Sequence, residues 1–282
     1  MTSIPVQIVS GATKVTFTAP NKFSYRLARS YTSGDKDTVS LKSQRMYYSW
    51  RNVTAAKDNT KYSYTWHDGT VVNVEMPDGI YSYADFQGYL EAVMQTKGHY
   101  LLDENSQPVY YIRFESNPVY YRISLTVSPI PASLPSGYTA PTGWSFPAAA
   151  VTPQVTIPAT NIRSYLGFDA GTYPAATQAT KYQVNGTAVP QVTDVSSLMI
   201  QCNLVRNQWG PSHQTLAAFN IAPGTAPGSM VSEVPYYEDR IQVQPSVQFE
   251  TIDVELVDQN GRPVIIEDTA GFITMLTIHR GN

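Results

Sequence analysis

Charged residues are scarce in this sequence. Asp, Glu, Lys and Arg make up 15% of the 282 residues, against roughly 25% in typical soluble domains. The formal net charge is only -3, so the sequence lacks the basic stripe with which nucleic-acid-binding proteins displace counterions from phosphates. The single cysteine, Cys202, excludes an intrachain disulfide and favours folding in a reducing compartment. We therefore expect no sequence-specific binding of nucleic acid.

Long apolar runs and clustered histidines are lacking as well. No stretch approaches the roughly 18 apolar residues of a membrane-spanning helix, and the N-terminus has no charged segment followed by an apolar one. The four histidines, at positions 67, 99, 213 and 279, stand singly, without the spacing of a metal or cupin-type site. Phosphate loops, dinucleotide fingerprints and nucleophile elbows are missing. We predict no membrane insertion, no metal, no cofactor, no catalytic residues and no enzymatic activity.

Tyrosine, proline and glycine are abundant instead, with 20, 20 and 17 residues. The hydrophobic content of 42% is sufficient for the core of one large domain or two small ones. Tyr is enriched and Lys and Glu are depleted at the centres of protein interfaces. The composition is therefore typical of a protein whose surface is largely covered by neighbouring subunits.

Apolar and polar residues alternate along much of the chain, which indicates strands with one buried face and a mainly all-β fold. The turn-forming sequence 258–261, which ends in Asn-Gly, predicts a hairpin. Cys202 falls in the buried register, which favours a small core residue over a reactive thiol. The expected strands are 62–66, 72–76, 110–114, 119–127, 198–204, 252–256, 264–266 and 272–278.

One segment has the periodicity of a helix. Ser82 and Asp85 resemble a capping box, and Gly98 ends the pattern. Between them, apolar residues recur at the spacing of one helix face: Phe86, Tyr89, Leu90, Val93 and Met94. We expect a single amphipathic helix that packs on a sheet.

Residues 123–162 contain no charge and carry prolines throughout positions 129–158. Because proline lacks the backbone donor of a ladder, this proline-rich stretch should not form a central strand. Tyr138, Trp144 and Phe146 provide apolar anchors that a solvated linker normally lacks. We predict an ordered loop here and take these three aromatic residues as candidate partner or interface residues.

Several segments, in their order and spacing, resemble a known family. They are Met-Tyr-Tyr-Ser-Trp at 46–50 with Asn52, Met-Pro-Asp-Gly-Ile-Tyr at 76–81, Tyr-Leu-Gly-Phe at 165–168, the stretch 195–205, and the closing hairpin at 258–262. Together they resemble the penton (vertex) proteins of virophages and of the related polinton or Maverick elements, within the jelly-roll capsid lineage.

That resemblance implies one eight-stranded antiparallel jelly-roll β-sandwich, formed by residues 1–66 and 191–282. An outward-projecting β-rich module with one helix would be inserted at 67–190. The protein would form homopentamers at the vertices of an icosahedral virion and bind the major capsid protein of the same virus. A host receptor and an accessory spike are further candidate partners. Synthesis and assembly would take place in the host-cell cytoplasm.

Two other functions are considered. In the first, the chain is a receptor- or glycan-binding spike module whose loop around Tyr138, Trp144 and Phe146 presents aromatic platforms. In the second, it is a β-sandwich hydrolase or lectin without a viral role. A pentamer would favour the capsid function, whereas a monomer or trimer that binds sugars would favour the spike module.

Overall fold

The computed structural model describes residues 3–208, 212, 214–222 and 225–281, and the chain divides into two compact units. Unit 1 consists of residues 1–50 and 195–282, and unit 2 of residues 51–194. Each has its own hydrophobic core. Unit 2 begins earlier than the expected residue 67, because β5 (Lys61–Thr65) pairs with other strands of unit 2. Within the described ranges, no helix is long and apolar enough to cross a membrane.

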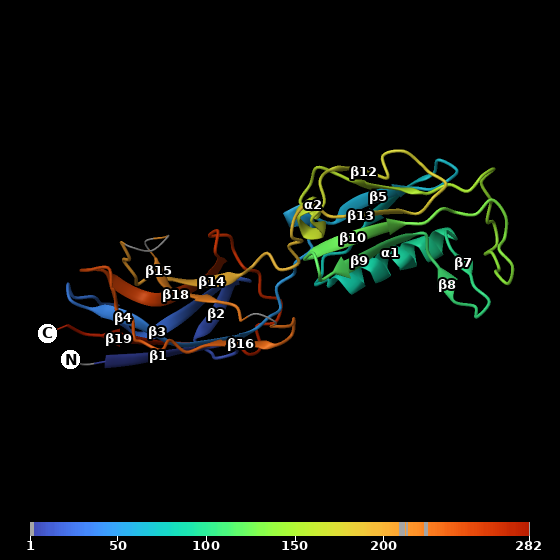
Figure 1. Ribbon diagram of the computed structural model, residues 1–282. Coiled ribbons are helices and arrows are strands. Elements are labelled where there is room, and N and C mark those ends of the chain that lie inside the picture. Colours follow the sequence, from blue (N-terminus) through green and yellow to red (C-terminus); the bar gives the residue numbers. More distant parts are fainter. Residues whose placement is uncertain (1–2, 209–211, 213, 223–224, 282) are drawn as a thin grey trace. The chain divides into compact units, whose positions relative to one another are not determined.

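Unit 1 is an antiparallel sandwich of two sheets (Figure 1). The first sheet has the order β1-β19-β4-β16, with β17 also paired to β4, and the second has the order β15-β14-β18-β3-β2. The strands are β1 (Ser3–Val9), β2 (Val15–Ala19), β3 (Lys22–Thr32), β4 (Thr38–Tyr47), β14 (Ser197–Cys202), β15 (Thr215–Asn220), β16 (Met230–Glu233), β17 (Ile241–Gln242), β18 (Gln248–Asp258) and β19 (Ile273–His279).

The strand order of unit 1 is that of a jelly roll. The chain crosses between the two sheets from β1 to β3, from β3 to β4, from β15 to β16 and from β18 to β19. Eight strands thereby form two four-stranded sheets, while β2 and β17 are additions at their margins. The expected jelly-roll fold is confirmed. Unit 2 is inserted between the third and fourth of these eight strands, β4 and β14.

The inward register of β14 is also as expected. Leu198, Ile200, Cys202 and Leu204 are all buried in the core of unit 1. Desolvation raises the pKa of the Cys202 thiol to about 12, which is the behaviour of a structural cysteine rather than a reactive one.

The hairpin turn after β18 forms, but its return segment is not a regular strand. The Asp258 carboxylate accepts hydrogen bonds from the backbone N–H groups of Asn260 and Arg262 at 2.8 and 2.9 Å. The expected strand at 264–266 is wrong, since a single bridge at Pro263 joins the segment to β18. Val264 and Ile266 are nevertheless buried. The backbone N–H of Ile266 donates to the carbonyl of Pro20, away from the hairpin, and this explains the early end of the ladder.

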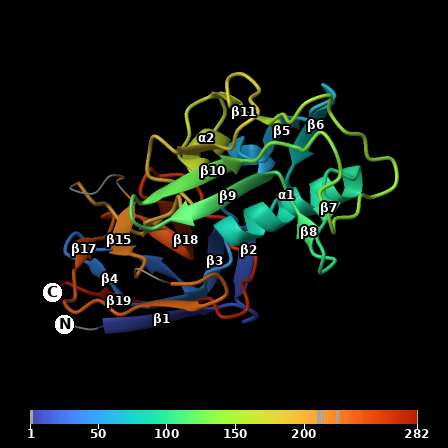
Figure 2. The same ribbon diagram turned by 45° about the vertical axis from the view of Figure 1, so that its right-hand side comes forward.

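Unit 2 contains two sheets, a short hairpin and two helices (Figure 2). One sheet has the order β12-β11-β5-β6, the other β13-β10-β9, and β7 pairs with β8. Besides β5, the elements are a 3-10 turn (Ala55–Lys57), β6 (Val71–Glu75), α1 (Tyr83–Lys97), β7 (Leu101–Leu102), β8 (Pro108–Val109), β9 (Ile112–Asn117), β10 (Arg122–Val127), β11 (Gln154–Ile157), α2 (Ile162–Leu166), β12 (Gly171–Tyr173) and β13 (Tyr182–Asn185).

Helix α1 confirms the sequence pattern in detail. Ser82 and Asp85 form both halves of the capping box, and Gly98 ends the helix in the left-handed conformation. The side chains of Phe86, Leu90 and Met94 are buried. The expectation of one helix is wrong, however, because α2 is a second one. With five residues it is too short to show a helical period in the sequence.

The strand expected at 119–127 begins only at residue 122. Strands β9 and β10 form a hairpin whose turn lies at 118–121, and Tyr121 has a positive φ of 51° there. Val119 and Tyr121 are therefore exposed, whereas Ile123, Leu125 and Val127 are buried as expected. The turn contains no glycine, and apolar and polar residues continue to alternate through it. The sequence pattern therefore predicts a strand that extends across the turn.

The charge-free segment lies entirely in unit 2 and has two kinds of structure. Residues 128–153 are largely irregular, as expected; the bridge Ile130–Val151 joins the two ends of the loop, and the bridge Leu102–Thr139 joins its middle to β7. At either end of this loop, β10 and β11 each have a strand on both sides in their sheets. Central strands therefore do occur within 123–162, but in the stretches between prolines.

Candidate functional site

Aromatic side chains form a cluster at one part of the unit 2 core. The ring of Trp66 stacks on that of His99 with centroids 4.2 Å apart and an interplanar angle of 3°. The hydroxyl oxygen of Tyr64 lies 2.8 Å from Nδ1 of His99. Burial lowers the pKa of His99 to about 4, although the nearby carboxylate of Asp68 acts in the opposite direction. His99 is thus a neutral ring in the core near pH 7.

The loop 128–153 covers this cluster. The Trp144 ring packs edge-on against Trp66 at 5.8 Å and lies 6.2 Å from Tyr111. The loop is also fixed by a 3.0 Å contact between Nε2 of His67 and the backbone carbonyl of Ser145. Because the loop's tryptophan packs on unit 2 itself, the loop completes the core of this unit.

The three candidate interface residues of the loop are in different environments. Tyr138 and Trp144 are half-buried and pack on the unit 2 core. Phe146 lies 5.9 Å from Trp144, ring centre to ring centre, and is 37% exposed. Within the part of the chain that the structure describes, no ring contact joins Tyr138 to the other two. Of the three, Phe146 is the most exposed.

Among the described residues, no three or more His, Cys, Asp or Glu side chains lie close enough together to bind a metal ion. His213 lies outside the described residues.

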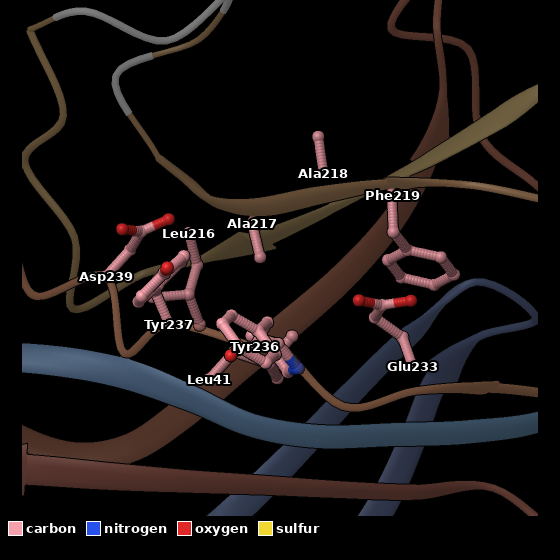
Figure 3. A pocket seen from close by; sticks show the side chains of 10 residues that line it. Leu41, Leu216, Ala217, Ala218, Phe219, Glu233, Tyr236, Tyr237 and Asp239 are labelled. Carbon is pink, nitrogen blue, oxygen red and sulfur yellow. The ribbon is translucent and has the colours of Figure 1, made fainter.

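A second candidate surface lies in unit 1 and is not among the candidates from the sequence. A pocket of about 300 Å³ opens between β15 and the segment that follows β16 (Figure 3). Its lining combines apolar side chains with two acids: Leu41, Leu216, Ala217, Ala218, Phe219, Glu233, Pro235, Tyr236, Tyr237 and Asp239. We call β15, β16 and the segment 234–240 the tyrosine edge.

The two tyrosines of this edge are the most exposed aromatic pair of unit 1 among the described residues. Tyr236 is 90% and Tyr237 75% exposed, and their rings meet edge-to-face at 4.7 Å. Val234 is 64% exposed beside them. Large apolar side chains gathered on a surface are typical of protein–protein contact sites. Tyr is also one of the residues that interfaces most often contain.

The segment that carries these tyrosines is fixed to the first sheet by Glu238. The Ser40 hydroxyl donates to Oε1 of Glu238 at 2.7 Å, and the Lys42 ammonium lies 2.6 Å from the same oxygen. Nε2 of His279 on β19 lies 2.8 Å from it. Hydrogen bonds from Lys42 and Ser40 lower the pKa of Glu238 to about 2. An ionised Glu238 thus keeps the two tyrosines on an anchored loop.

No protein-family model and no curated protein matches the sequence. Among solved structures, the crystal structure of the mavirus penton protein has a TM-score of 0.47 and 9% identity, over 98% of this chain and 97% of that one. A chain of the cryo-EM structure of the Sputnik virophage has a TM-score of 0.43 and 14% identity, over 99% and 98%. Both matches span nearly the whole of this chain.

Proposed function

We propose that this protein is a structural, non-catalytic subunit of a viral capsid that assembles as a homopentamer at the icosahedral vertices. The observation that carries the proposal is the strand order of unit 1, with sheets β1-β19-β4-β16 and β15-β14-β18-β3. This jelly-roll order is used by viral capsid proteins as well as by lectins and cupins. The segments that resemble virophage and polinton pentons favour the capsid function among these three.

The surface of unit 1 supports an assembling subunit. The tyrosine edge exposes Tyr236 and Tyr237 on an anchored loop. Leaving such side chains in water is unfavourable, and burial against another subunit removes that cost. The low charge content of the whole chain, 15%, agrees with a protein that is extensively covered in its assembly.

The proposed partners are further copies of this chain and the major capsid protein of the same virus, and the proposed location is the virion. Assembly would take place in the host-cell cytoplasm. The receptor- or glycan-binding alternative is less well supported, because Tyr138 and Trp144 pack on the unit 2 core. A host receptor or accessory spike stays a candidate partner of the exposed remainder of unit 2, including Phe146.

The test combines the mass of the purified protein with its place in a particle. Light scattering should give a pentamer of about 156 kDa, five times 31.2 kDa, at high protein concentration or with the major capsid protein added. Image reconstruction of assembled particles should then locate the chain at the five-fold vertices. A chain that stays monomeric in all these conditions, or one that binds sugars as a monomer or trimer, would contradict the proposal.

A further inference from the structure

The tyrosine edge combines apolar surface with negative charge. The Glu233 carboxylate lies beneath the Phe219 ring, and the Asp239 carboxylate lies beside Tyr237 (Figure 3). Among the residues that the structure describes, neither acid forms an ion pair, unlike Glu238 on the same loop. An apolar hollow with unpaired acids at its margin fits a partner that brings both apolar groups and cations.

The opposite margin of the same sheet has these properties. The second sheet runs from β15 at one side to β3 and β2 at the other. Lys14, Arg26 and Arg29 are exposed there, and the described residues provide no ion pair for any of them. The backbone N–H of Arg26 donates to the carbonyl of Lys14 at 2.9 Å, which brings two of these residues together. We call this margin the cationic edge.

Apolar side chains accompany these cations. Val15, Phe17, Tyr25 and Leu27 are only partly buried against the unit 1 core. Residues 27–30 lie outside the register that joins β3 to β18, so this part of β3 leaves the regular ladder. The cationic edge therefore presents cations, which could pair with Glu233 and Asp239, and apolar side chains, on which Tyr236 and Tyr237 could pack.

We propose that the tyrosine edge of one copy binds the cationic edge of the next copy. This inference rests on the proposed capsid function and names the two surfaces through which copies would associate. Glu233 and Asp239 would pair with Lys14, Arg26 and Arg29, while Tyr236 and Tyr237 pack on the partly buried apolar residues. Tyrosine rings also attract guanidinium groups through their faces.

The placement of the two edges explains why such a contact would form a ring. The two surfaces differ: the tyrosine edge combines β16 of the first sheet with β15 at one margin of the second, and the cationic edge lies at the other margin of the second sheet. Each copy would therefore use one surface toward each neighbour. Such a heterologous contact closes into a ring when the rotation between copies divides a full turn evenly. The same contact repeated five times would give the pentamer.

Charge reversal in the full-length chain tests the pairing, with the oligomer mass measured by analytical ultracentrifugation over a range of concentrations. The variants are E233K/D239K on the tyrosine edge, R26E/R29E on the cationic edge, and the combination of all four. Each two-site variant should need at least about tenfold more protein for half-assembly, because like charges then face each other. The combined variant should assemble nearly as wild type does, since opposite charges meet again.

Mixing the two variants gives an independent readout. Reversing one edge gives the two edges of a variant net charges of the same sign, with Lys14 left unchanged in R26E/R29E, so a copy of one variant fits only copies of the other. Copies of the two variants must therefore alternate around a ring. This is impossible in a ring with an odd number of subunits. The mixture should therefore form open chains or even-numbered rings, not pentamers.

The control is R163E/K181E, which reverses two exposed cations of unit 2 that have no ion pair among the described residues. It should assemble as wild type does. Thermal unfolding of each variant checks its fold. If E233K/D239K does not fold, D239K is used in its place, and if R26E/R29E does not fold, R29E is used.

If the wild type forms pentamers and the edge variants assemble equally well, the proposed interface is wrong. The proposed capsid function would be unaffected by that result. Impaired two-site variants without rescue by the combination would overturn the charge pairing. A wild type that never assembles, even with the major capsid protein, would overturn both proposals.

Discussion

The two units differ in what they do with a loop that carries aromatic residues. In unit 2, the loop 128–153 places Trp144 against Trp66 and Tyr111, so its largest side chain completes the core. In unit 1, the segment 234–240 is fixed by Glu238 but leaves Tyr236 and Tyr237 in solvent. Both loops are ordered and aromatic. The loop in unit 1 leaves both tyrosine rings in solvent, whereas Trp144 of the unit 2 loop packs on the core and Phe146 is the one exposed aromatic residue among the three of that loop.

This difference shows why aromatic content alone is a poor guide to an interaction surface. A loop that must cover an open core uses its aromatic residues internally, and its removal exposes that core. A loop that is held in place by hydrogen bonds and ion pairs can leave its aromatic side chains exposed to solvent. The contrast leads to three predictions about the separate units.

The largest stability effect is expected in the core of unit 1. Ile200→Ala should lower the free energy of unfolding by about 2 to 5 kcal/mol, because it removes a fully buried side chain and leaves a cavity. Chemical denaturation monitored by hydrogen exchange would show whether the loss is confined to unit 1. Ile265→Ala is the matched control, since Ile265 is 44% exposed in the same unit. A loss of similar size at Ile265 would contradict the burial described here.

A smaller effect is expected for the loop of unit 2. Trp144→Ala should cost about 2 to 3 kcal/mol, less than a fully buried tryptophan, because Trp144 is half-buried. The neighbouring change Phe146→Ala should cost less than about 1 kcal/mol, because the Phe146 ring is exposed. Denaturant titrations with tryptophan fluorescence would measure both. Equal small losses would mean that the loop is only a spacer, and unit 2 would then not depend on it.

The third prediction concerns the pH dependence of unit 2. His99 has a pKa of about 4 in the folded protein against 6.5 ordinarily, so the unfolded chain binds more protons between these values. The stability of unit 2 should therefore fall as the pH is lowered from about 6.5 to about 4. His99→Phe keeps a ring against Trp66 but cannot titrate, and thermal unfolding of this variant should depend less on pH in that window. An unchanged pH profile would exclude His99 as the cause.

Sequence patterns predicted the helices and strands that are determined by a few neighbouring residues. The capping box of α1 and the alternation of β14 each lie within one short stretch, and both appear in the structure as expected. The five-residue α2 is too short to leave a comparable pattern. The turn at 118–121 has a signal in the turn-forming pair Asn117-Pro118, but apolar and polar residues alternate through the turn, and this alternation predicts a continuous strand.

The tyrosine edge was missed for a different reason. Its exposure depends on β15 and β16 lying at sheet margins, and strand order is a tertiary property. The sequence contains one usable signal, the adjacent pair Tyr236-Tyr237 between Pro235 and the acids Glu238 and Asp239. The pair alone does not identify a surface, because the adjacent Tyr110 and Tyr111 between β8 and β9 are both buried in unit 2.

Covalent capture of neighbouring copies tests the central claim most directly. The double variant Tyr237→Cys, Arg29→Cys places one thiol on each edge, while the natural Cys202 is buried and should not react. A flexible bismaleimide should then give a ladder of covalent species that ends at the pentamer, and each single variant should give no ladder. A double variant that assembles into pentamers yet yields only uncrosslinked chains would show that copies do not meet at these two edges.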